Sequence, residues 1–112
     1  MNDKELLVLA AKAAGLDGEV RELRSGYRDH FSQIRYRRRE AFVTKGIVWD
    51  PLTDDGDALR LATKLHMNID ITESDVYASA YGVCSERASP DVHAALRRAI
   101  TRAAAEIGAA MP

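Results

Sequence analysis

An alanine-rich amphipathic segment near the C-terminal end, residues 92–108, narrows the choice of folds for this chain. Its apolar side chains recur every three or four positions: Val92, Ala95, Leu96, Ala99, Ile100, Ala103 and Ile107. This spacing puts them on one face of a helix that ends at Gly108. Ser89 as the cap and Pro90 at the first helical position predict its start. Because most of these side chains are small, we expect the helix to pack closely against a sheet.

Two further helices are predicted upstream of this segment. Residues 3–14 have leucines and alanines at helical spacing, and Gly15 suits the left-handed position that ends a helix. The second helix follows Pro51, takes Thr53 as its expected N-cap and ends near His66. Three carboxylates lie in its first turn: Asp54, Asp55 and Asp57. Negative charge at this end of a helix interacts favourably with the helix dipole.

The remaining segments predict β-strands. Residues 33–39 alternate between apolar and basic side chains, as a half-exposed strand does, and residues 41–49 are its expected partner. Residues 68–72 and 76–84 predict a hairpin with a short acidic turn between them. Residues 17–32 are mixed and polar, so we expect a loop there with at most a short strand.

Together these elements predict the α+β class and a single domain over residues 1–112. The expected architecture is an α-β-α sandwich with three helices packed on a small, mostly antiparallel sheet. The chain is 46% hydrophobic and 29% charged, as folded globular proteins are. No apolar run approaches the roughly 20 residues of a membrane span. The N-terminus also lacks the basic-then-apolar order of a signal peptide, so we expect a cytoplasmic protein.

The net charge of −1 conceals a strong asymmetry along the chain. Residues 21–45 contain eight basic and three acidic side chains, a net +5, whereas residues 50–75 contain seven acidic and two basic ones, a net −5. One interpretation is that the two segments face each other, or cover different sides of the domain, and largely cancel. The other is a local anion-binding face on the basic segment, because arginine pairs with phosphate and stacks on flat rings.

No motif in the chain indicates catalysis or a metal site. The run Asp54–Asp57 fails as an EF-hand loop, because Pro51 and Ala62 would stand where carboxylates are required. Cys84 is typical of a small buried residue. The chain has three histidines, none at metal-ligand spacing: His30, His66 and His93. We expect no catalytic residue, no metal and no cofactor, and a small hydrolase with a histidine–carboxylate pair is the least favoured alternative.

Aromatic and basic residues interleave between residues 27 and 42. The rings belong to Tyr27, Phe31, Tyr36 and Phe42, and the arginines among them are Arg28, Arg35, Arg37, Arg38 and Arg39. A nucleotide site needs a plane to stack the base and arginine to hold phosphate. If this segment is a site, we expect the four arginines from Arg35 to Arg39 to hold phosphates and Tyr36 or Trp49 to stack the base. The simpler interpretation makes the rings core residues and the arginines a solvated strand face.

Three stretches of the chain are similar to a known family. They are residues 49–62 (WDPLTDDGDALRLA), residues 99–108 (AITRAAAEIG) and the leucine- and alanine-rich N-terminal helix up to Gly15. These stretches resemble the phage α-β-α (ABA) sandwich domain of tailed bacteriophages and prophages. The resemblance covers about half of the chain and leaves residues 21–48 unmatched. It implies an accessory protein made in a bacterial host's cytoplasm, with helices on a small sheet, and it implies no reaction.

We therefore expect a non-enzymatic phage accessory protein that binds a host-cell ligand. The most specific form of this expectation is a counter-defence protein that sequesters a signalling nucleotide. The first alternative is a protein–protein interaction module, either a homo-oligomer or an inhibitor of an acidic host protein. The second alternative is a weak nucleic-acid binder, less favoured because the pI of about 6.3 is low for that class. We expect no membrane partner.

Overall fold

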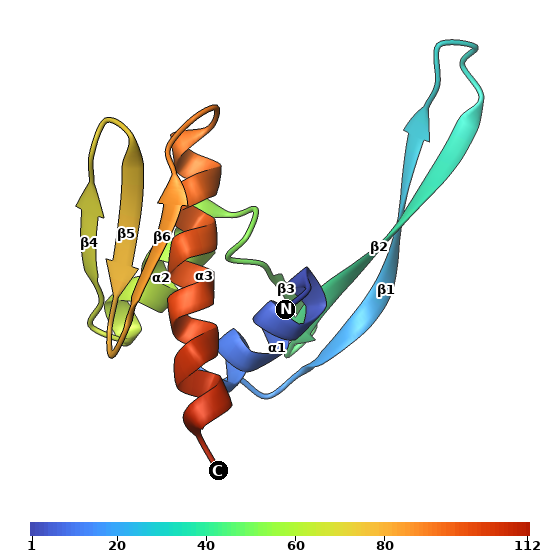
Figure 1. Ribbon diagram of the computed structural model, residues 1–112. Coiled ribbons are helices and arrows are strands. Elements are labelled where there is room, and N and C mark those ends of the chain that lie inside the picture. The colour runs from blue at the N-terminus through green and yellow to red at the C-terminus, as the bar shows by residue number, and fades with distance from the viewer.

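The computed structural model describes all 112 residues and places the C-terminal helix at the centre of the molecule (Figure 1). The helices are α1 (Asp3–Ala13), α2 (Asp55–Lys64) and α3 (Val92–Ala110). The strands are β1 (Glu19–Arg28), β2 (Ile34–Thr44), β3 (Ile47–Trp49), β4 (Asn68–Ile71), β5 (Asp75–Ser79) and β6 (Val83–Arg87). The α+β class with three helices and antiparallel strands is confirmed. The strands divide between two sheets, β1-β2-β3 and β4-β5-β6, rather than forming one.

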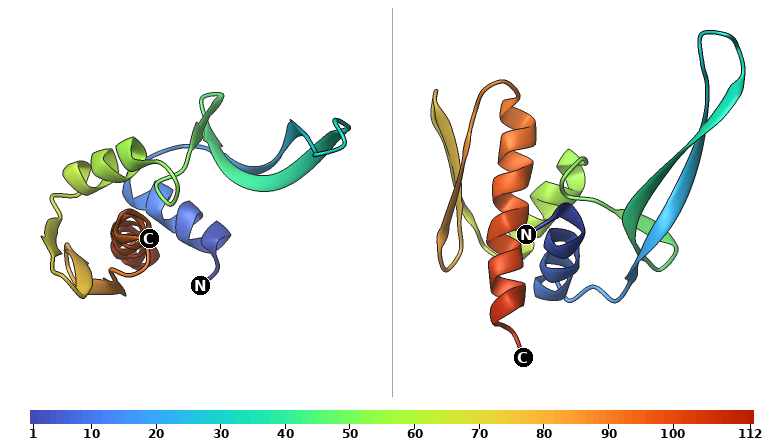
Figure 2. Two further views of the ribbon diagram at one scale, coloured as in Figure 1. Left: turned by 90° about the horizontal axis from the view of Figure 1, so that it is seen from above. Right: turned by 45° about the vertical axis from the view of Figure 1, so that its right-hand side comes forward.

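Helix α3 contacts α1, α2 and the β4-β5-β6 sheet, and it lies among all three when the molecule is seen from above (Figure 2). Its inner positions hold small side chains that are almost fully buried: Ala99, Ala103, Ala104 and Ala105. Small side chains let neighbouring backbones approach closely, so the predicted close packing is confirmed and involves helices as well as a sheet.

Gly108 marks the closest approach between α1 and α3. The prediction that α3 ends there is wrong, since the helix continues to Ala110. A Cβ atom on Gly108 would lie 2.7 Å from the carbonyl carbon of Leu9, well inside van der Waals contact with the backbone of α1. Glycine is therefore required at this position by the approach of a second backbone and not by helix termination.

Replacing Gly108 by alanine should destabilise the protein. We expect Gly108→Ala to lower the free energy of unfolding by about 2–3 kcal/mol, the upper part of the range for overpacking that forces backbone shifts. The higher helix propensity of alanine, about 1 kcal/mol, offsets only part of this loss. Urea denaturation measures the change. Gly56→Ala in α2 is the matched control, because its Cβ would meet side-chain ends, those of Arg60 and of the capping residue Asp54, and no backbone of another element. Equal midpoints for the two variants would contradict this account.

The structure corrects the predictions for residues 17–49. Residues 19–28 are not a loop but the ten-residue strand β1, paired with β2 from Glu19↔Val43 to Arg28↔Ile34. Residues 33–39 and 41–49 are not partner strands, since residues 34–44 form one continuous strand. The turn comes instead at Lys45 and Gly46, whose φ values of 50° and 76° are those of the tight turn between twisted antiparallel strands.

The second sheet and the helix starts also differ from the predictions. Residues 76–84 are not one strand, because the chain turns between Ser79 and Val83 to form β5 and β6. Asp54, not Thr53, caps α2 by accepting the backbone N–H of Asp57 at 2.8 Å.

At α3, Asp91 replaces the predicted cap Ser89, and Pro90 lies outside the helix. One carboxylate oxygen of Asp91 accepts the N–H groups of His93 and Ala94 at 3.0 and 3.1 Å. These two hydrogen bonds, of which the one from Ala94 has the larger effect, hold the pKa of Asp91 below its usual value. At both helices an aspartate is the N-cap in place of the predicted Thr53 or Ser89. An ionised acceptor is stabilised there by the positive end of the helix dipole as well as by its hydrogen bonds.

Candidate functional site

The β1–β2 hairpin extends far beyond the helices, and its outer part stands clear of the rest of the molecule (Figures 1 and 2). We call residues 24–39 the arm. Every residue of the arm is exposed except Asp29, which is half-buried. The base of the hairpin is different, since Ala41, Phe42 and Val43 are buried. The arm therefore presents both of its faces to solvent.

Positive charge is concentrated on the arm. It contains six arginines and one aspartate, a net +5, which leaves −6 on the rest of a chain whose net charge is −1. A single ion pair joins the basic segment to the acidic one, between Arg39 Nη1 and Asp50 Oδ2 at 3.7 Å. The two segments thus lie on different sides of the molecule and do not face each other, so their charges are not paired locally.

Five of the six predicted site residues lie in a row on β2, but on two faces. Side chains alternate along a strand, so Arg35, Arg37 and Arg39 share one face, while Tyr36 and Arg38 share the other. Strand β1 adds two arginines that were not among the predicted site residues: Arg24 lies opposite Arg38, and Arg28 opposite Ile34. They were missed because β1 lacks the alternation of apolar and polar residues that identifies a half-buried strand.

The arginines of the arm are either unpaired with carboxylates or paired only at the surface. Arg35 contacts Asp29 at 3.0 Å, and Arg38 contacts Glu22 at 3.3 Å. The Arg38–Glu22 pair is exposed on both sides, and such pairs contribute about 0–1 kcal/mol, so an external anion can replace Glu22 at little cost. Arg37 has no carboxylate partner and lies over the ring of Tyr27, 4.5 Å from its centroid. Arg24 and Arg28 also have no carboxylate partner.

Trp49, the sixth predicted site residue, lies apart from the other five. It is 9% exposed and belongs to the hydrophobic core at the base of the hairpin. Its ring meets that of Phe42 edge to face, with centroids 5.8 Å apart. Little of Trp49 is therefore open to a ligand, whereas Tyr36 on the arm is 68% exposed and offers its ring freely.

The tip of the arm is an ordered turn built on Asp29. One carboxylate oxygen accepts the backbone N–H groups of Phe31 and Gln33 at 2.9 and 3.0 Å, and the other accepts Arg35 Nε at 3.0 Å. The Arg35 guanidinium, followed by the Gln33 and Phe31 amides, holds the pKa of Asp29 below its usual value. The turn is thus closed by one ionised side chain, and we find Phe31 at its outer end, 73% exposed.

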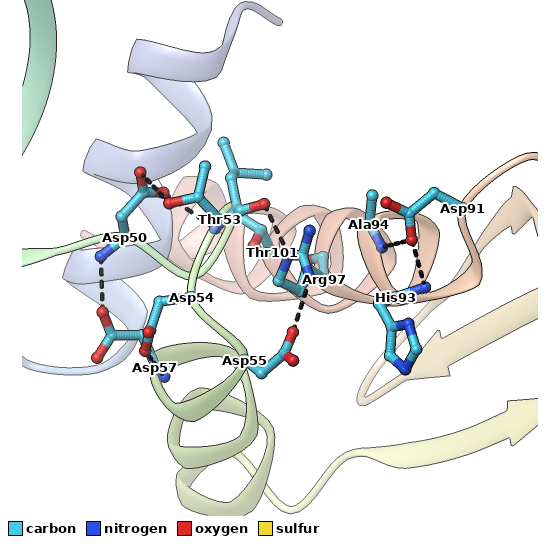
Figure 3. Close-up of polar contacts among 11 residues, drawn as sticks. Asp50, Thr53, Asp54, Asp55, Asp57, Asp91, His93, Ala94, Arg97 and Thr101 are labelled. Carbon is cyan, nitrogen blue, oxygen red and sulfur yellow. Dashed lines mark hydrogen bonds and ion pairs between the residues drawn. The ribbon is translucent and has the colours of Figure 1, made fainter. Parts of the chain in front are cut away.

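The acidic block that follows Trp49 has a structural role, and its prediction as a helix start is confirmed (Figure 3). The carboxylate of Asp50 accepts hydrogen bonds from the Leu52 N–H and the Thr53 hydroxyl. The backbone N–H of Asp50 donates to the carboxylate of Asp57 at 2.9 Å. Arg97 of α3 then joins α3 to this block. Its guanidinium contacts Asp55 at 2.6 Å and donates to the Leu52 carbonyl at 3.0 Å.

The histidines and the cysteine form no common site. His30 lies at the arm tip, His66 just beyond α2 and His93 in the first turn of α3. Nowhere do three or more His, Cys, Asp or Glu side chains gather in a group able to hold a metal ion. Cys84 is buried, and its thiol lies 3.4 Å from Glu106 Oε1. Burial first, and then Glu106, raise the pKa of Cys84 to about 11.

The Cys84 thiol should be unreactive in the folded protein. With a pKa of about 11 it stays protonated at pH 8, and the thiolate is the reactive form. Ellman's reagent should therefore modify Cys84 at pH 8 only after urea unfolds the chain, with Cys84→Ser as the blank. Because the folded pKa is raised, this group's contribution to stability is present below pH 9.0 and declines as the pH rises toward 11. Rapid labelling of the native protein would show that the thiol is accessible.

Comparison with protein-family models, curated proteins and solved structures finds no match for this chain. The resemblance to the phage ABA sandwich domain therefore stays a prediction. None of the three helices has both the length and the apolar character that crossing a membrane requires.

Proposed function

We propose that this protein binds nucleic acid through the arm. The observation that carries this proposal is a two-stranded ribbon with a net charge of +5 that stands clear of a core with a net charge of −6. Two-stranded β-ribbons bind duplex DNA in its major or its minor groove. Each strand of the arm runs for five or six residues, about 17–20 Å at the rise of a β-strand, which matches about five base pairs.

The distribution of the arginines favours an extended polyanion over a single nucleotide. Arg35, Arg37 and Arg39 follow one face at intervals of about 7 Å, so they reach successive phosphates more readily than they converge on one. The hollow beside Arg38 and Arg39 is lined otherwise only by Glu22 and Glu40, whose carboxylates repel phosphate. Nucleotide sequestration, the sharpest expectation from the sequence, therefore has less support than the nucleic-acid alternative.

The charge of the core also favours an oriented encounter. Phosphates attract the arm and repel the acidic remainder, so the arm leads the approach of the protein to the polyanion. Bound phosphates would replace a weak surface partner such as Glu22. A low overall pI does not oppose this function, because the phosphates meet the local charge of the arm and not the mean charge of the chain.

Removing unpaired arginines from the arm should weaken nucleic-acid binding and its salt dependence together. We expect Arg24→Gln/Arg37→Gln to reduce affinity for a short duplex about tenfold or more and to flatten the slope of log K against log salt by about 2, one per phosphate contact. Fluorescence anisotropy over a range of salt concentrations measures both quantities.

The matched control is Arg87→Gln, at an exposed arginine on β6 and outside the arm. It should leave affinity and slope close to those of the unaltered protein. Single nucleotides and cyclic oligonucleotides are titrated in parallel. Tight, weakly salt-dependent binding of one of these with no binding of duplex or single strands would favour sequestration instead. Absence of nucleic-acid binding at low salt would refute the proposal.

A second candidate function, a protein–protein interaction module, is favoured by apolar side chains on the same arm. Ile34 and Tyr36 are 58% and 68% exposed and lie two residues apart on one face of β2. Exposed apolar side chains that adjoin one another mark interaction surfaces more often than isolated ones do. A homo-oligomer built on this face would dissociate in Ile34→Ser, as light scattering can measure, and its stability would depend little on salt.

A further inference from the structure

The arm ends in an apolar side chain that nothing in the fold uses. Phe31 is 73% exposed, and its only ring neighbour is His30, with centroids 4.1 Å apart. The hydrogen bonds of the turn involve the backbone of Phe31 and not its ring, so any residue with a backbone N–H could form the same turn. The phenyl ring therefore does not serve the folding of the tip.

The turn nevertheless holds the backbone of Phe31 in a defined position. Asp29 N–H donates to the Gln33 carbonyl at 3.0 Å, and Ser32 N–H donates to the Asp29 carbonyl at 2.9 Å. Arg28 closes the turn from the other side by donating to the Ser32 carbonyl at 3.0 Å. With the two bonds from the Asp29 carboxylate, these contacts restrain the backbone around residue 31. An exposed ring on a restrained turn loses little conformational entropy when it inserts into a partner.

Each of the two strands that meet at this turn carries an arginine close to it. Arg28 ends β1 and Arg35 lies near the start of β2, so each strand brings one guanidinium to the base of the turn. An apolar ring at the end of a ribbon with a cation on each strand fits a partner that has an apolar interior between two lines of negative charge. The stacked base pairs of a duplex between their phosphate backbones have this arrangement.

We infer that Phe31 is a wedge that inserts between neighbouring base pairs, so that the protein favours duplexes that are easily unstacked and kinked. This inference rests on the proposed nucleic-acid binding and adds the kind of DNA that is preferred. Apolar side chains inserted at base steps unstack them and bend the duplex, and the cost is lowest where stacking is already weak. The arginines then supply the affinity for nucleic acid in general, and the Phe31 ring supplies the preference for easily unstacked duplexes.

The test compares a continuous short duplex with the same duplex carrying one central mismatch, and it measures affinity by anisotropy. The unaltered protein should bind the mismatched duplex about tenfold more tightly, because the unstacking cost is already met there. Phe31→Ala should lose this preference while keeping the salt slope, since no phosphate contact is removed. Phe31→Leu, which keeps an apolar wedge, should retain part of the preference.

Bending is read independently by energy transfer between dyes at the two duplex ends. Transfer should rise when the unaltered protein binds and should not rise with Phe31→Ala. Equal affinity of the unaltered protein for both duplexes, with salt-dependent binding intact, would overturn the wedge and leave the proposed function standing. Failure to bind any duplex or single strand at low salt would overturn both. Thermal unfolding of each variant establishes that the substitution has not altered the fold.

Discussion

The close packing of α3 against α1 is the contact on which the rest of the structure depends. Gly108 and the buried alanines of α3 let the two backbones approach, and the opposite side of α3 covers the β4-β5-β6 sheet. Arg97 then ties the start of α2 to α3 through Asp55 and the Leu52 carbonyl. The core is thus assembled around one helix, and it needs no contribution from the outer half of the β1–β2 hairpin.

The arm is therefore not needed to stabilise the core. Burial of Phe42 and Trp49 anchors the hairpin at its base, and beyond that point only the backbone ladder and surface contacts hold the strands together. A two-stranded ribbon without a covered face has little intrinsic stability. Arginines that face one another, such as Arg24 and Arg38, lower it further, so bound phosphates would relieve a repulsion that the free protein carries.

The elements that sequence reasoning located correctly are those with a buried face. Periodic apolar residues identified all three helices, and the acidic residues after Pro51 were correctly assigned to the start of α2. Strand β1 was missed because Glu19–Arg28 is exposed along most of its length and so has no apolar periodicity to detect. In the exposed turn the only residue that indicates a turn is Asp29, four residues before the predicted strand 33–39. One such residue does not suffice to predict a hairpin.

The amino-acid sequence by itself determined the class of the fold, the positions of the helices and the concentration of arginine between residues 24 and 39. These follow from local propensity and from charge, which depend on residues near one another in the chain. Only the tertiary structure decided that Trp49 is a core residue, that Gly108 is a helix contact, and that the arginines stand away from the acidic segment. Each of these depends on which distant segments meet, because burial and charge pairing are properties of neighbours in space and not of neighbours in sequence.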